Sequence, residues 1–173
     1  EGRVVKISLP DKMLPIFQVV EYLRAFLTGR IGWSSLRSLL IISGAFGLYK
    51  KSEVIEIGGY DLYTDTEDLE LVVRLHENMS RKKKKYRIVF VPDPVCWTEV
   101  PTKMKILFRQ RNRWHRGLLQ TLIRHTRVLF NPRYKVLGLF AFPYFLLFEM
   151  LGPFGIAAKE KSICTLKSCQ CRI

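Results

Sequence analysis

The chain has 173 residues, of which 48% are hydrophobic and 12% aromatic, and this composition excludes a disordered protein. The length suits one domain with its own core and hardly two. A formal net charge of +14 implies an anionic partner: a nucleic acid, an anionic membrane surface or a phosphorylated substrate. Because the chain begins at Glu1 rather than Met, we expect a fragment of a longer protein.

The first elements in chain order are a helix and two short extended segments. Pro15 can open a helix, because its missing N–H would be unpaired there, and apolar residues recur at helical spacing until Gly29. Residues 39–42 and 47–49 predict extended segments on either side of Ser43-Gly44-Ala45. Glycine in such a place indicates that another group approaches the backbone closely.

The middle of the chain predicts two helices and two strands. Residues 52–57 predict a short helix that ends at Gly58-Gly59. Thr64 and Glu67 have the spacing of a capping box, which predicts the start of the second helix. The remaining segments are a solvated basic loop at 81–85, a strand at 87–91 and a short strand at 95–98.

A long basic helix and an apolar run follow. Pro101 opens the helix, Asn131-Pro132 breaks it, and the stretch from Lys103 to Lys135 holds ten Lys and Arg and no acid. Residues 136–158 are apolar except for Glu149, and as a helix they would be roughly 34 Å long against a hydrocarbon core of about 30 Å.

This order of a basic stretch and an apolar run predicts a transmembrane helix at 136–158 with its basic side in the cytoplasm. The alternative is a buried helix of a soluble protein. The order also favours a lipid bilayer over nucleic acid as the anionic partner, and we expect no nucleic acid to bind.

The four cysteines do not predict a metal site. Cys96 is isolated in a strand-like segment and is interpreted as a small buried hydrophobic residue. Cys164, Cys169 and Cys171 lack the paired spacing of a zinc site, so we expect reduced thiols and no metal ligands among them.

Two motifs can carry chemistry, and the first is Thr66-Glu67-Asp68 at the start of a helix. Acids are common in a first helical turn, where the N–H groups and the helix dipole favour negative charge. The alternative is catalytic: Asp68 would be a general base that takes a proton from an acceptor hydroxyl within hydrogen-bond reach.

The second motif contains Gln110, Arg113 and Trp114, which share one helical face at spacings i, i+3 and i+4. Arginine suits a diphosphate, tryptophan offers a flat face to a sugar ring, and glutamine can bridge to oxygens. The other interpretation is an amphipathic helix at a membrane interface, in which Trp114 anchors and Arg113 reaches the headgroups.

The order of these motifs resembles the processive family-2 glycosyltransferases, which include cellulose, chitin, hyaluronan and poly-N-acetylglucosamine synthases. Gln-x-x-Arg-Trp begins 42 residues after Asp68, and an apolar run follows. Other matching segments are Ser43-Gly44-Ala45-Phe46, Gly58-Gly59-Tyr60-Asp61 and Val91-Pro92 through Trp97-Thr98-Glu99. The bacterial poly-N-acetylglucosamine synthase type is the most similar, and the resemblance covers residues 1 to 152.

The resemblance implies a fold, a reaction and roles for these residues. The implied fold class is α/β, the C-terminal part of a GT-A glycosyltransferase domain, followed by an interfacial helix and a transmembrane helix. Asp68 matches the catalytic base. The substrate-binding positions match Thr66, Glu67, Gln110, Arg113, Trp114, Ser43 and Gly44.

The implied enzyme is a membrane-bound inverting hexosyltransferase that adds a sugar, N-acetylglucosamine by the closest resemblance, from a UDP-sugar to a growing β-linked polysaccharide. Its cofactor would be Mg²⁺ or Mn²⁺. The family's Asp-x-Asp metal motif is absent upstream of Ser43, so the metal ligands are expected mainly in a missing N-terminal half and the fragment alone is expected to be inactive. The full protein is expected to be multi-pass in the cell membrane with a cytoplasmic catalytic domain.

These interpretations divide the chain into four parts, which are an acceptor-side half of the catalytic domain at 1–100, a basic interfacial region at 101–135, the span at 136–158 and an irregular tail at 159–173. We hypothesise that the tail is a sequencing or frame artefact. Two other functions fit the sequence. One is a lipid-acceptor transferase of the ceramide glucosyltransferase type, and the other is a basic membrane-anchored binding module without catalysis.

Overall fold

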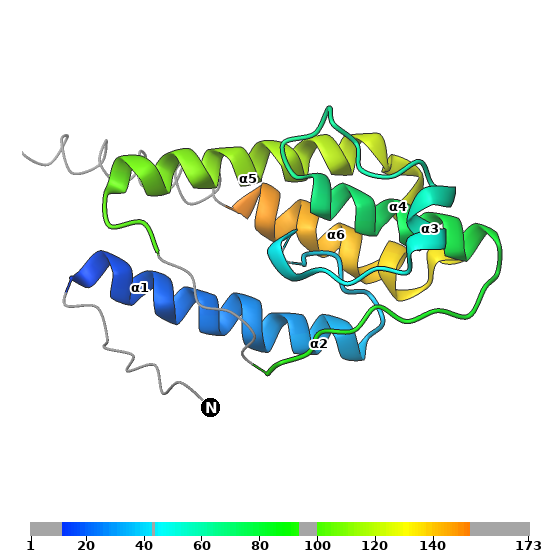
Figure 1. Ribbon diagram of the computed structural model, residues 1–173, viewed down its shortest axis with the longest axis horizontal. Helices are drawn as coiled ribbons and strands as arrows, with labels where there is room; N and C mark the ends of the chain where they lie inside the picture. Colours follow the sequence, from blue (N-terminus) through cyan, green and yellow to red (C-terminus); the bar gives the residue numbers. More distant parts are fainter. Residues whose placement is uncertain (1–11, 43, 94–99, 153–173) are drawn as a thin grey trace, which may run out of the picture.

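In the computed structural model, residues 12–42, 44–93 and 100–152 are described, and two long helical rods run along the molecule (Figure 1). The first rod is continuous and consists of α1 (Met13–Tyr22), the π-helical η1 (Leu23–Thr28) and α2 (Gly29–Ser35). The second rod is α5 (Met104–Arg124). Shorter elements pack beside and between them: η2 (Gly44–Phe46), α3 (Lys51–Glu56), α4 (Glu67–Arg81), η3 (Thr126–Val128), η4 (Pro132–Tyr134), η5 (Leu137–Ala141), α6 (Phe142–Tyr144) and η6 (Phe145–Met150).

The hydrophobic core lies where α4, α5 and the last helical segment meet. Its members are buried apolar side chains that recur at helical spacing, namely Leu69, Val73, Leu118, Leu122, Val128, Leu137, Ala141, Phe142, Phe145 and Met150, together with Leu40. Burying a leucine- or phenylalanine-sized side chain contributes roughly 1.5–3 kcal/mol each relative to leaving it in water. This core therefore fixes α4 and α5 against each other.

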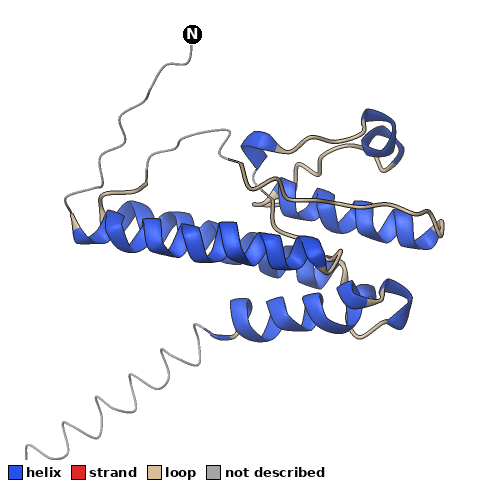
Figure 2. Cartoon of the chain, turned by 90° about the horizontal axis from the view of Figure 1, so that it is seen from below, coloured by secondary structure: helices blue, strands red, loops and turns tan. Residues whose placement is uncertain are grey.

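The expected strands are not present among the described residues, and the α/β expectation is wrong for this part of the chain (Figure 2). Residues 39–42, 47–49 and 87–91 have irregular backbone without ladder hydrogen bonds. A strand needs a neighbouring strand to satisfy its N–H and C=O groups, and no described segment supplies one. The strand expected at 95–98, Cys96 within it and the tail at 159–173 lie outside the described residues.

His76 of α4 holds two of these extended segments in place. Its side chain is 1% exposed, and burial lowers its pKa to about 4, so the ring is neutral at pH 7. The Nε2–H group donates to the Leu39 carbonyl oxygen at 2.9 Å, which leaves Nδ1 to accept from the Tyr86 hydroxyl at 2.6 Å. Two hydrogen bonds of the His76 side chain therefore link these parts of the chain, which hydrogen bonds between strands do not.

Helix boundaries differ from the sequence predictions at two points. The helix does not stop at Gly29, because this residue has right-handed helical angles (φ −62°, ψ −45°) and the rod continues to Ser35. The N-cap residue of α4 is Thr66, not Thr64, and its side chain makes no capping hydrogen bond, so the capping-box prediction is wrong. The predicted short helix is confirmed as α3, and Gly58 and Gly59 end it with φ values of +89° and +75°.

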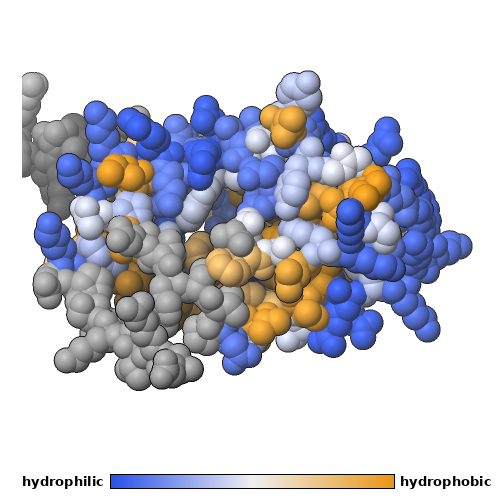
Figure 3. Space-filling model, in the orientation of Figure 1, coloured by the Kyte–Doolittle hydropathy of each residue, from blue (hydrophilic) through white to orange (hydrophobic). Residues whose placement is uncertain are grey.

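The long basic helix is confirmed, although it ends at Arg124, earlier than the break expected at Asn131-Pro132. The basic loop of residues 81–85 is exposed as predicted. Figure 3 shows strongly hydrophilic side chains crowding the end of the molecule where α3 and the C-terminal end of α4 lie.

The run expected as one transmembrane helix at 136–158 is described only as far as Gly152. It is helical from Leu137 to Met150, mostly with π-type hydrogen bonding, and one side of it is buried in the core. Within residues 12–42, 44–93 and 100–152, no helix has both the length and the apolar character to cross a membrane, and the expected span is not supported.

A group of charged side chains fastens the middle of α4 to the end of α5. Glu70 is buried, and its two carboxylate oxygens lie 2.7 Å from Arg74 Nη2 and 3.3 Å from His125 Nε2. The other ring nitrogen of His125 lies 2.8 Å from Glu77. Arg74 also donates to the carbonyl oxygens of Ile57 and Gly59, both at 2.7 Å, and so holds the turn after α3.

These contacts shift two pKa values in opposite directions. Burial opposes the charge on His125, but the hydrogen bonds to Glu70 and Glu77 outweigh it and raise the pKa above the ordinary value of 6.5. Burial likewise opposes the charge on Glu70, but His125 and Arg74 lower its pKa below 4.5. Both groups are therefore charged in the folded chain between these values.

We expect the His125→Gln change to cost the most stability between pH 4.5 and 6.5. A raised histidine pKa stabilises the fold fully below 6.5, and this contribution is lost as the pH rises through the folded value. The lowered Glu70 pKa adds a contribution that is present above 4.5 and is lost at more acid pH. Urea unfolding of both proteins across this range measures the difference, and a cost that grows above pH 7 would contradict the assignment.

We expect Gly117→Ala to destabilise the fold by about 1–3 kcal/mol, although alanine favours helix. A β-carbon at residue 117 would lie 2.2 Å from Thr66 Oγ1 and 2.7 Å from Thr66 Cβ, so α5 and the start of α4 would have to separate. Gly32→Ala in α2 is the matched control, because no atom lies within 4 Å of the added carbon. It should stabilise by about 0.5–1 kcal/mol, and equal unfolding midpoints for the two variants would contradict the packing described.

Candidate functional site

The candidate site begins where the start of α4 meets the middle of α5. Thr66, the N-cap of α4, packs directly on Gly117, and Asp68 follows in the first helical turn. The preceding loop also runs along α5, since Asp61 pairs with Arg124, and the Asp65 N–H donates to Gln120 Oε1 at 2.9 Å. The position of Asp68 is therefore fixed by α5 as well as by its own helix.

Asp68 is half-buried and has three neighbours from other segments. A β-carbon on Gly44 would lie 3.3 Å from Asp68 Oδ2, so this glycine leaves the carboxylate accessible. Asp68 favours the charged form of Arg30, whose pKa is lowered mainly by burial. Tyr49 is also close, and burial, Tyr60 and Asp68 together raise the pKa of its hydroxyl. The Leu69 N–H lies 2.8 Å from Asp68 Oδ1, as the first turn of a helix allows.

The Gln110, Arg113 and Trp114 side chains differ in exposure. Trp114 is half-buried one turn before Gly117, with the Phe26 ring 6.2 Å from its own ring and the Arg111 guanidinium 4.8 Å from its centre. Gln110 is also half-buried, and its Oε1 has no hydrogen-bond partner among the described residues. Arg113 is exposed on the neighbouring side of α5.

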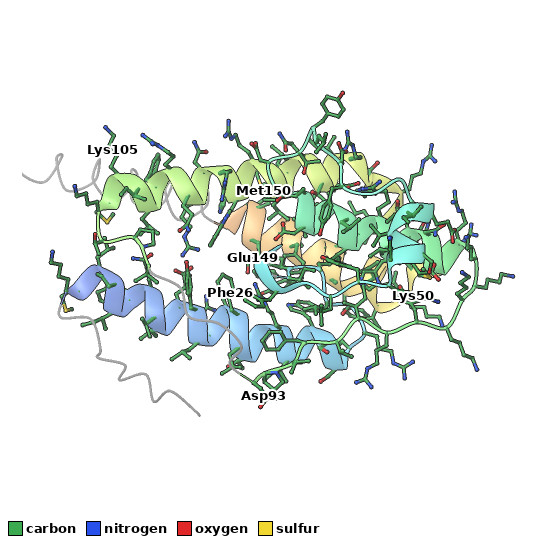
Figure 4. All side chains as sticks on the ribbon, in the orientation of Figure 1. Phe26, Lys50, Asp93, Lys105, Glu149 and Met150 are labelled. Carbon is green, nitrogen blue, oxygen red and sulfur yellow. The ribbon has the colours of Figure 1, made fainter. Side chains whose placement is uncertain are left out.

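The first rod links the two motifs. Glu21 of α1 forms an ion pair with Arg111 of α5 at 2.5 Å, and Gln18 Nε2 donates to the Pro101 carbonyl at 2.7 Å. Further along this rod, Phe26 projects toward the layer that contains α5 (Figure 4). Arg30 follows one turn later, and its guanidinium lies 4.4 Å from the Phe26 ring. A continuous set of neighbours thus runs from Trp114 through Phe26 and Arg30 to Asp68.

Three site residues were missed by sequence reasoning, namely Phe26, Arg30 and Tyr49. Phe26 belongs to a helix whose apolar spacing indicated packing only, Arg30 comes directly after the expected end of that helix at Gly29, and Tyr49 lay in an expected extended segment. The i, i+4 spacing of an aromatic ring and an arginine was the available signal. Three predicted site residues are not part of this set: Glu67 and Arg113 are exposed, and Ser43 lies outside the described residues.

The described residues do not form a metal site. No group of three or more His, Cys, Asp or Glu side chains within them is placed to hold a metal ion. The two aspartates that precede the candidate base are engaged, since Asp61 pairs with Arg124, and Asp65 lies 3.4 Å from Arg116 Nε. This donor set does not fit the Mg²⁺ or Mn²⁺ ion that the motif order implies.

Comparison with known proteins identifies similar chains. Over 121 residues the chain is 35% identical to the poly-beta-1,6-N-acetyl-D-glucosamine synthase of Staphylococcus aureus (strain COL), an alignment that covers 69% of this chain and 27% of that protein. It is 30% identical to the synthase of the same name from Staphylococcus epidermidis over 147 residues, which are 85% of this chain and 33% of that protein.

The chain therefore spans about a third or less of the length of these relatives. No solved structure gives a significant match. The family model described as glycosyl transferase family group 2 matches residues 17–166, which include the described parts of both motifs. The chain belongs to this glycosyltransferase family.

Proposed function

We propose that the complete protein transfers a sugar from a UDP-sugar to a growing β-linked polysaccharide with inversion at the anomeric carbon. The observation that carries the proposal is the packing of Thr66 on Gly117, which holds Asp68 on the same side of α5 as Trp114. The similarity to two synthases of poly-beta-1,6-N-acetyl-D-glucosamine favours N-acetylglucosamine as the sugar.

In the proposed reaction, Asp68 accepts the proton of an acceptor hydroxyl. The hydroxyl oxygen forms the new bond to the anomeric carbon, the bond from that carbon to the phosphate oxygen breaks, and UDP leaves. A positioned base of this kind contributes about 10²–10⁴-fold to a rate. Trp114 and Gln110 would hold the acceptor sugar so that attack is nearly intramolecular, through ring stacking and an amide hydrogen bond.

The negative charge of the leaving diphosphate must be met by cations. Family members use UDP-sugar donors and typically a divalent metal, and Mg²⁺ or Mn²⁺ would then be held by residues outside the described set. Exposed Arg113 can reach a phosphate from the rim of the site. Preorganised charge at a leaving group is usually the largest single contribution to catalysis.

The proposal includes a cell-membrane location for the complete protein, with the catalytic part on the cytoplasmic side. An apolar groove with a volume of about 530 Å³ lies between α2 and the segment from η5 to η6, lined by residues that include Trp33, Leu36, Phe140 and Phe148. Large exposed apolar surfaces of this kind favour contact with lipid or with another apolar surface. The basic residues of α5 suit anionic headgroups.

The alternative within glycosyl transfer is addition of a single sugar to a lipid, as in the ceramide glucosyltransferase type. The apolar groove is the observation that favours it, because an acyl chain could lie there. Product length separates the two: a ladder of polysaccharide lengths from the complete enzyme supports polymerisation, and one glycolipid product supports the alternative.

We expect Asp68→Asn in the complete protein to lower the transfer rate by about 10²–10⁴-fold, because the amide cannot accept the proton. Binding of UDP should be retained, since the amide has nearly the shape of the carboxylate. Transfer is measured as radiolabelled sugar incorporated into polymer, and UDP binding by equilibrium dialysis.

The matched control is Asp93→Asn, which removes the same charge from an exposed residue outside the site. Its transfer rate should equal that of the wild type. A transfer rate for Asp68→Asn that equals the rate of this control would remove Asp68 from the role of base.

A further inference from the structure

Arg30 is a cation near the candidate base that the mechanism above leaves unused. It is half-buried at the start of α2, with the Phe26 ring 4.4 Å and the Phe90 ring 5.8 Å from its guanidinium carbon. No described carboxylate lies within 4 Å of it, and its Nε is buried without a hydrogen-bond partner among the described residues. An arginine kept in this state has unused donors.

Burial of such a group costs free energy unless an anion compensates. Removal from water lowers the pKa of Arg30, and Asp68 partly offsets this shift through its negative charge. Asp68 alone does not satisfy the guanidinium, because the two groups do not form an ion pair. The surroundings of Arg30 therefore favour a second anion beside Asp68.

The flanking rings limit how that anion can bind. Aromatic faces attract the guanidinium carbon and leave the N–H groups at the edge of the planar group for an acceptor. A diphosphate offers several charged oxygens that match paired N–H donors, whereas a sugar hydroxyl offers a weaker, neutral acceptor. A diphosphate next to Asp68 would also experience repulsion, which a guanidinium near both groups reduces.

We propose that Arg30 is a donor-binding residue whose guanidinium contacts the diphosphate of the nucleotide sugar beside Asp68. This proposal rests on the proposed function and adds to it. It makes the rod of α1, η1 and α2 part of the donor site. Arg113, the exposed arginine of the Gln-x-x-Arg-Trp motif, would then be a second and more peripheral cation for the diphosphate.

The experiment measures UDP binding to the complete protein by equilibrium dialysis, for the wild type and for Arg30→Gln, Arg30→Lys and Arg24→Gln. Charge-assisted hydrogen bonds predict that Arg30→Gln weakens UDP binding roughly 10- to 100-fold. Arg30→Lys keeps the charge but loses the paired donors, so we expect a smaller loss. Arg24→Gln is the matched control, because Arg24 is exposed on the same rod, and its UDP affinity should equal that of the wild type.

Thermal unfolding of each variant separates binding from folding. If Arg30→Gln does not fold, Arg30→Lys decides the matter: weaker UDP binding at an unchanged melting temperature supports the proposal, and wild-type binding overturns it. If Arg30→Gln folds and binds UDP as Arg24→Gln does, the proposal is overturned.

Failure of this proposal differs from failure of the proposed function. In the first case UDP binds Arg30→Gln normally, while the wild type still forms polysaccharide and Asp68→Asn does not. In the second case the wild type itself neither binds UDP nor transfers sugar. A raised KM for the acceptor alone, with unchanged UDP affinity, would assign Arg30 to the acceptor and overturn the donor assignment.

Discussion

Helix α5 touches the start of α4 only because residue 117 has no side chain. The space that a β-carbon would need is filled by Thr66, and Thr66 is the residue at which α4 begins. The charged loop contacts along α5 are exposed or partly exposed and contribute about 0–1 kcal/mol each, so they are secondary to this packing. The position of Asp68 relative to α5 therefore depends on the close approach of the Thr66 side chain to the Gly117 backbone.

Charged side chains hold the middle of α4 against the end of α5. Glu70 pairs with both Arg74 and His125, His125 also pairs with Glu77, and Arg74 donates to two carbonyl groups of the turn after α3. Buried charges are tolerated when each has its partners, and removal of one leaves the others unpaired. The start of α4 is thus held by close packing of Thr66 on α5, and its middle is held by charged pairs. The apolar core also joins the two helices.

Features that depend on interactions local in the sequence were predicted, and features that depend on contacts between distant segments were not. The ending of α3 at Gly58-Gly59 depends on local backbone freedom, and the amphipathic character of α5 on local spacing, so both were predicted. The strand expected at 87–91 needs a partner segment, and instead His76 contacts Tyr86, just before it, and Leu39 in the expected extended segment at 39–42. The capping-box prediction failed because Thr64 and Thr66 have the same side chain, and the sequence pattern does not show that Thr66 is the one at the N-cap, where it packs on Gly117.

The sequence motifs predicted two segments of the candidate site, and they gave no indication of the third segment, which contains Arg30. Asp68, Gln110 and Trp114 stand out by residue type and order, whereas Arg30 is one arginine among 29 basic residues. Its importance comes from the ring beside it and the carboxylate near it, which belong to separate segments. The family resemblance identifies residues such as Asp68 and Trp114, whereas Arg30 is identified only by its neighbours in the structure.

The continuity of the first rod has a mechanical consequence. Gln18, Glu21 and Phe26 fasten it to the chain before α5 or to α5 itself, while Arg30 stands on the same axis beyond them. Because the helix is unbroken from Met13 to Ser35, a displacement of Arg30 along the rod would also move Glu21 and its ion pair with Arg111, which lies over the Trp114 ring.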